Sequence, residues 1–153
     1  VRDNNYIGHD LDIDLGVNYK PGIDKKIEEE MKNAGFKIEL SFFIGDQICE
    51  HSYRKNGIKI DIFFFNRDGD STYCYFFHRK GSETYYANKV SWNKFTTRDK
   101  SFRGTMVPTP YPPKDFVIEH YGDTWNQVIK NWVYYRDPKN MKLVEETGRV
   151  VIH

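Results

Sequence analysis

The chain has 153 residues, and its 23 Lys and Arg nearly balance its 22 Asp and Glu. This balance excludes the broad positive field with which proteins hold nucleic acid through its phosphates. Two cysteines are too few for a disulfide framework, and no apolar run is long enough to span a membrane. The length allows a hydrophobic core without disulfide or metal staples. We therefore expect residues 1–153 to form a single domain.

The first half of the chain alternates between strand and helix patterns. An amphipathic helix is expected over 23–34, because Ile23, Ile27 and Met31 recur every four residues and Gly35 can cap its end. Asn56-Gly57 and Lys80-Gly81-Ser82 are typical hairpin turns. The predicted strands are 11–17, 36–43, 48–54, 58–65, 71–79 and 83–89.

The second half is more irregular in its pattern. Residues 93–104 are polar, and several prolines then punctuate a segment that we expect to lie irregularly over the sheet's surface. Pro113 suits the first turn of a short helix, and an aromatic segment over 125–135 is the last predicted helix. No repeat or linker interrupts the chain, so these elements predict an α+β domain.

Three aspartates alternate along the first predicted strand. Asp10, Asp12 and Asp14 fall on one face of an extended segment. Their charges repel one another, which protonation or a bound cation must relieve. Carboxylate oxygens suit Mg²⁺, which commonly bridges protein carboxylates and substrate phosphates. The pattern indicates a metal-dependent enzyme acting on phosphates; the alternative is an edge strand with a charged solvent face.

A second acid lies in an otherwise apolar strand. Asp61 is flanked by Ile60 and Ile62, where burial of an unpaired carboxylate is costly. It therefore needs a metal, a hydrogen-bond donor or a cation beside it. Lys59, two residues away on the same strand face, is the alternative partner to a metal.

Two acids on one strand and a third on a neighbouring antiparallel strand resemble the nucleotidyltransferase fold. That resemblance implies an α+β fold, with a nucleotidyltransferase-like mixed or antiparallel sheet and flanking helices. In that fold the three acids hold Mg²⁺ against a nucleotide's phosphates, which stabilises in-line displacement at phosphorus.

The flanking residues narrow this resemblance to one family. In chain order they are Tyr6 to Val17, Ala34-Gly35-Phe36, Lys59 to Phe64, Val107-Pro108, His120-Tyr121-Gly122-Asp123-Thr124-Trp125, Trp132 and Arg136-Asp137-Pro138-Lys139-Asn140. With these motifs the chain resembles the fukutin and LicD-type phosphotransferase family over most of its length.

The resemblance implies Mg²⁺-dependent transfer of a phospho-alcohol, with Mn²⁺ as a substitute ion, from a CDP-linked donor to a glycan hydroxyl, releasing CMP. Family members transfer phosphocholine or ribitol phosphate, in capsule and other surface-glycan synthesis. By matching position, Asp12 and Asp14 bind the metal, and Asp61 is the third catalytic and metal-binding carboxylate. By matching position, Arg2 would contact phosphate and Asp10 would have a supporting role. Lys59, His120, Tyr121 and Trp125 are further candidates for binding substrate.

Two features depart from the family pattern. Gly8-His9 replaces a frequent Pro-Trp, and the family's glycine-containing segment is expected upstream of Val1. The chain is therefore expected to be a fragment that binds the donor less tightly than a chain extended upstream.

Alternative interpretations remain at this stage. Tyr121 and Trp125 either form a wall for a sugar or pack the short helix onto the sheet. Transfer of a nucleoside monophosphate from a triphosphate and a non-catalytic binding module are alternative functions. Zinc held by two cysteines and two histidines (Cys49, Cys74, His51 and His78) is disfavoured by their spacing, so reduced, packed thiols are expected. The expected compartment is the cytoplasm for a bacterial source and the Golgi lumen for an animal one.

Overall fold

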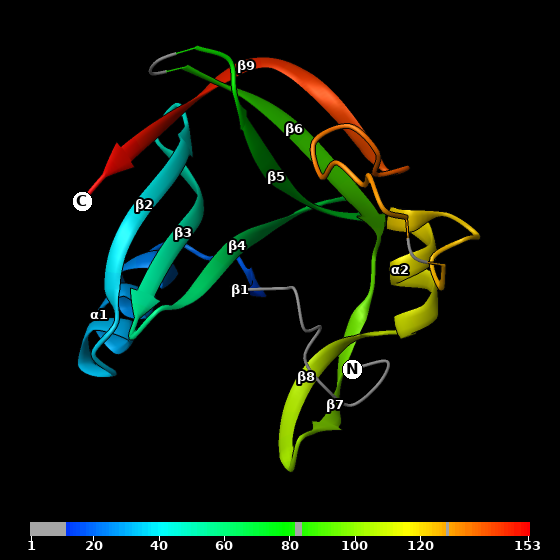
Figure 1. Ribbon diagram of the computed structural model, residues 1–153, viewed down its shortest axis with the longest axis horizontal. Helices are drawn as coiled ribbons and strands as arrows, with labels where there is room; N and C mark the ends of the chain where they lie inside the picture. The colour runs from blue at the N-terminus through cyan, green and yellow to red at the C-terminus, as the bar shows by residue number, and fades with distance from the viewer. Residues whose placement is uncertain (1–11, 82–83, 128) are drawn as a thin grey trace.

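A computed structural model describes residues 12–81, 84–127 and 129–153 of the chain (Figure 1). Strands account for 58% and helices for 14% of these described residues, so the fold is mostly β. The elements are β1 (Asp12–Asn18), α1 (Ile23–Asn33), β2 (Lys37–Ile44), β3 (Gln47–Lys55), β4 (Ile58–Asp68), β5 (Ser71–Arg79), β6 (Thr84–Asn93), β7 (Thr96–Phe102), β8 (Thr105–Tyr111), α2 (Pro113–Tyr121) and β9 (Met141–Ile152).

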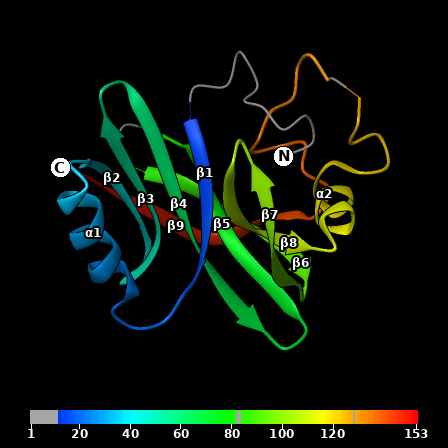
Figure 2. The same ribbon diagram turned by 90° about the horizontal axis from the view of Figure 1, so that it is seen from below.

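Six strands close into a barrel. The strand order is β1-β4-β3-β2-β9-β6-β5, and β5 pairs back onto β4. This closure is short, because β4 and β5 pair only at three positions beside their hairpin, from Asn66 with Tyr73 to Asp68 with Ser71. Further along β4, the edge opposite β3 is taken by β1, which runs parallel to β4 (Figure 2). The strand β1 therefore lies at the seam of the barrel.

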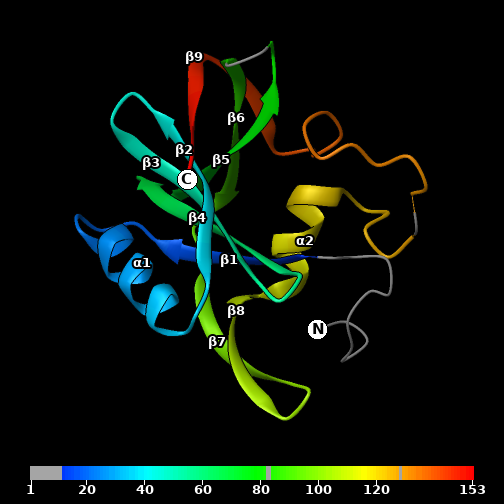
Figure 3. The same cartoon turned by 60° about the vertical axis from the view of Figure 1, so that its left-hand side comes forward.

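The closed barrel corrects the predicted α+β fold with a nucleotidyltransferase-like sheet and flanking helices. The two helices of the described residues are short and do not cover the two faces of an open sheet; they lie on opposite sides of the strands (Figure 3). The predicted antiparallel relation between the two acid-bearing strands is also wrong, because β1 and β4 are parallel. The strand pairing that closes the ring depends on β9, for which the sequence pattern gave no strand prediction.

The helix α1 covers one face of β4. Its apolar positions Ile27 and Met31 pack on a buried cluster that contains Ile62 and Phe64. Those two residues alternate with Asp61 along β4, so α1 lies on the face opposite the acid. Neither described helix has the length and apolar character needed to cross a membrane.

Two other segments differ from prediction. The stretch predicted to be polar and irregular forms the ribbon of β7 and β8, in which Thr97 faces Pro110 and Asp99 faces Pro108. Within the part of the chain that the structure describes, each of these strands has a single partner, and proline is tolerated where its missing N–H would point away from the ladder. The predicted helix over 125–135 is absent, because its described residues form successive turns.

Gly148 on β9 allows close packing inside the barrel. A Cβ atom there would lie 2.5 Å from two ring atoms of Phe77, whose ring stacks on Phe42 at 5.1 Å. We expect Gly148→Ala to lower the free energy of unfolding by about 1–3 kcal/mol, since the packed ring must shift. Urea unfolding measures this change.

The matched control is Gly81→Ala, because a Cβ atom at Gly81 meets nothing within 4 Å. It should stay within about 0.5 kcal/mol of the unchanged protein. Equal stabilities of the two variants would contradict the described packing of β9.

Candidate metal-binding site

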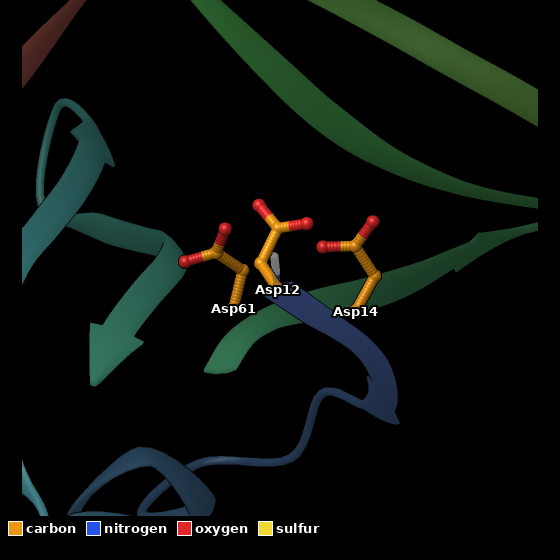
Figure 4. Close-up of side chains that lie close together, drawn as sticks. All are labelled: Asp12, Asp14 and Asp61. Carbon is orange, nitrogen blue, oxygen red and sulfur yellow. The ribbon is translucent and has the colours of Figure 1, made fainter. Parts of the chain in front are cut away.

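Strand register brings the predicted acids together. Asp14 lies opposite Asp61, and Asp12 lies opposite Lys59, in the parallel pairing of β1 with β4. Alternation places these four side chains on one face, away from α1. Figure 4 shows the three carboxylates projecting to the same side of the two strands.

The three carboxylates are close enough to share one ion. Each of Asp12, Asp14 and Asp61 offers an oxygen within 4.8 Å of the others. Among the described residues, they form the one group of three or more acidic, histidine or cysteine side chains with this geometry. Three hard oxygen ligands suit Mg²⁺ or Mn²⁺, so the residues present fit the implied metal. The histidines and cysteines considered for zinc form no such group in the part of the chain that the structure describes; Cys49 and Cys74 are buried free thiols.

Asp61 is held by two neighbours. Its Oδ1 accepts a hydrogen bond from Ser52 Oγ at 2.5 Å, and its Oδ2 lies 2.5 Å from Lys59 Nζ. Lys59 Nζ also lies 3.6 Å from Asp12 Oδ2. The predicted alternative, a pair between Asp61 and Lys59, is thus present together with the three-acid cluster. The ammonium group offsets part of the repulsion among the carboxylates.

The acids keep Lys59 charged despite partial burial. Burial lowers the pKa of Lys59, but the hydrogen bond and charge of Asp61, with the charge of Asp12, outweigh it, and the pKa ends above its ordinary value. Asp61 is only 5% exposed, whereas Asp14 is exposed. The site therefore has a buried, fixed side at β4 and an accessible side at β1.

A fourth carboxylate, that of Glu50, was missed in the sequence analysis. Glu50 lies on β3 two residues from Ser52 and is 8% exposed. Burial, reinforced by the charges of Asp61 and Asp14, raises its pKa to about 8, although Lys59 acts in the opposite direction. The available signal was its position in a predicted strand, on the same face as the residue paired with Asp61.

Of the other predicted substrate-binding residues, three lie on α2 or just after it, and two fall outside the described residues. His120 is 8% exposed, stacks on Trp92 at 5.7 Å and bonds Asn140 through Nδ1 at 3.1 Å. Burial lowers its pKa to about 4, against the effect of that bond. Tyr121 packs on His120 and Trp132 with an exposed edge, and Trp125 is half-buried. Arg2 and Asp10 fall in the segment before residue 12, outside the description.

Three relatives share sequence with almost the whole chain. They are named ribitol-5-phosphate transferase FKTN in Mus musculus (30% identity over 89% of this chain), Macaca fascicularis (28% over 92%) and Homo sapiens (27% over 92%). These matches, at 27–30% identity, support the fukutin and LicD-type family that the motifs of the chain resemble. The chain spans about 30% of the length of these relatives, covering 29% of the mouse protein and 30% of the other two. No family model and no solved structure matches it.

A divalent ion should bind this fukutin-like chain through its β1 aspartates. We expect Asp14→Asn to weaken Mn²⁺ binding by about tenfold or more, because one anionic ligand is lost. Free Mn²⁺ measured by electron paramagnetic resonance gives the affinity. Asp46→Asn, in the exposed turn between β2 and β3, is the control and should leave affinity unchanged. Identical binding by both variants would exclude Asp14 as a ligand.

Glu50 should make the stability of the metal-free protein depend on pH. Its pKa is about 8 when folded and near 4.5 when exposed, so the folded state binds more protons than the unfolded state between these values. The contribution of Glu50 to the free energy of unfolding is therefore fully present below pH 4.5 and is lost as the pH rises through 8. Glu50→Gln has no carboxyl group to ionise at this position. The free energy of unfolding of the variant, relative to that of the unchanged protein, should therefore rise by roughly 3 kcal/mol from pH 5 to pH 8.

Denaturant unfolding at the two pH values, without metal, tests this expectation. The exposed Glu145 on β9 supplies the control, because Glu145→Gln should show no such growth. A free energy of unfolding of Glu50→Gln that falls, relative to that of the unchanged protein, as the pH rises would contradict the raised pKa of Glu50.

Proposed function

We propose that this chain carries the catalytic carboxylates of a Mg²⁺-dependent transferase. It would move ribitol phosphate, or a similar phospho-alcohol, from a CDP-linked donor to a glycan hydroxyl and release CMP. The observation that carries the proposal is the cluster of Asp12, Asp14 and Asp61, with their oxygens within 4.8 Å of one another.

The names of the relatives indicate which group is transferred. Each is named a ribitol-5-phosphate transferase, and the similarity covers about nine tenths of the chain. The CDP donor and the glycan acceptor come from the family resemblance, and Mg²⁺ from the hard oxygen ligands.

Each residue of the site has a distinct part in this proposal. Asp12 and Asp14 would hold the ion from the accessible side, and Asp61 from the buried side. A bound Mg²⁺ supplies positive charge that stabilises the phosphate oxygens during transfer. Ser52 and Lys59 fix both oxygens of Asp61 and so limit its rotation. Lys59 also brings a positive charge that can contact a donor phosphate.

The reaction itself is an in-line displacement. The acceptor hydroxyl oxygen forms a bond to the phosphorus that carries the alcohol, and the bond from that phosphorus to the bridging oxygen breaks. CMP leaves with the bridging oxygen and the bond's electron pair. The hydroxyl proton passes to a carboxylate of the site. Asp61 is the candidate for this base, because Ser52 and Lys59 hold it in place.

Release of CMP from CDP-ribitol tests the proposal. With Mg²⁺ and a saccharide acceptor, we expect CMP to appear and chelation to stop its formation. Asp12→Asn and Asp14→Asn should each lower the rate by about a hundredfold or more, since charge stabilisation at phosphorus is lost. Asp46→Asn should retain full activity.

The products distinguish the alternatives. Pyrophosphate released from a nucleoside triphosphate would indicate transfer of a nucleoside monophosphate instead. An Asp14→Asn variant that folds and keeps the full rate would exclude the acidic cluster as the reacting site.

A further inference from the structure

Two adjacent tyrosines stand out on the segment between α2 and β9. Tyr134 is 51% and Tyr135 is 42% exposed, although both rings pack against other rings on one side. Their ring centroids are 5.1 Å apart and their planes are at 89°. We call this pair the aromatic corner. Parts of two rings set at a right angle are therefore open to solvent.

A compact turn holds the aromatic corner in place. The backbone N–H of Val133 donates to Asp137 Oδ2 at 2.7 Å, and the N–H of Asp137 returns to the Val133 carbonyl at 2.9 Å. Arg136 donates to both oxygens of Asp137, at 2.7 and 3.1 Å. The Arg136-Asp137 motif therefore closes the turn that presents the two tyrosines.

The rings are fixed to the barrel as well. Tyr134 donates its phenol to the Phe77 carbonyl at 2.8 Å. Tyr135 stacks on His78 at 4.4 Å and 14°, and His78 stacks in turn on Tyr86 at 5.0 Å and 26°. A ligand that binds rings already held in place does not have to order them.

A row of aromatic rings runs from the strand that carries Asp61 to the aromatic corner. Phe63 follows Asp61 on the same face of β4, its ring lies 5.1 Å from Phe76, and that ring lies 6.5 Å from Tyr134. The electrostatics agree with this arrangement. Burial raises the pKa of the Tyr134 phenol, the charge of Glu50 adds to the rise, and the charge of Lys59 opposes it.

We propose that the aromatic corner binds a sugar ring of the acceptor glycan. The inference rests on the proposed function, which requires a saccharide beside the carboxylates. A sugar has an apolar C–H face and a rim of hydroxyls, and rigid aromatic rings with a few polar groups are suited to such a body. The Tyr134 oxygen, whose proton is given to Phe77, is left to accept a hydrogen bond from a hydroxyl.

The angle between the rings favours a sugar over the cytosine base of the donor. A flat base stacks best on a ring face, or between parallel faces. Two rings at a right angle instead suit a thicker ligand, such as a sugar ring, that touches both rings. The corner thus differs in shape from a slot built for a nucleobase.

The test measures binding of simple glycosides without metal or nucleotide. We would titrate methyl glycosides of hexoses and N-acetylhexosamines into the full chain and follow saturation transfer to their protons. Tyr135→Leu should lower the affinity for the glycoside that binds by about fivefold or more, because the aromatic ring is lost and only an apolar side chain remains. Tyr135→Phe keeps the ring and should keep the affinity.

Tyr111→Leu is the matched control. Tyr111 is 38% exposed, but it lies on the β7–β8 ribbon against Arg98. Its replacement should leave glycoside binding unchanged. Failure of every glycoside to bind, or equal affinities of Tyr135→Leu and Tyr111→Leu, would overturn the inference; so would a selective loss of CMP affinity in Tyr135→Leu.

The outcome is independent of turnover. Glycoside binding that depends on Tyr135, together with no CMP release from CDP-ribitol, would contradict the proposed function and leave a saccharide site. CMP release without glycoside binding would contradict the aromatic corner alone.

Discussion

The parallel pairing of β1 with β4 is the constraint on which the acidic site depends. It fixes Asp14 opposite Asp61 and Asp12 opposite Lys59, so carboxylates that repel one another are held together by backbone hydrogen bonds. A register shift of one residue would turn the β1 aspartates toward the face that α1 covers. The apolar residues under α1 and the charged residues on the other face therefore specify the same alignment. Lys59 adds the positive charge that makes this alignment tolerable.

Local patterns were sufficient to predict many elements. The Ile23, Ile27 and Met31 spacing located α1 to within a residue, and the Asn56-Gly57 turn located the hairpin between β3 and β4. The global fold was not predictable in this way, because closure of the barrel depends on β9, whose charged and glycine-containing centre lacks a clear strand pattern. The prolines of β8 concealed a strand for a different reason: they interrupt the pattern but sit in a ribbon where each strand has one partner.

The site shows the same division between local and long-range information. The period of the aspartates on β1 and the isolation of Asp61 in an apolar strand drew attention to these acids, and the family resemblance selected Asp12 and Asp14 over Asp10. Their common location, however, comes from a parallel register that no local signal contains. Glu50 is recognised only once Ser52 is seen to face Asp61, and the two exposed tyrosines only once the turn closed by Asp137 is seen. Residues that act through tertiary neighbours leave little trace in periodicity.

The separation of β1 from β4 along the chain affects the stage of folding at which the metal-binding site forms. The hairpins β2–β3, β3–β4 and β5–β6 join strands that follow one another, so each can form early with little loss of chain entropy. By contrast, β1 must find β4 across an intervening helix and two strands, at an edge that exists only after that meander has formed. The carboxylates would then assemble in a late step of folding. A chain that had collapsed but had not inserted its first strand would lack the ion-binding cluster altogether, which makes ion affinity a direct reporter of complete folding.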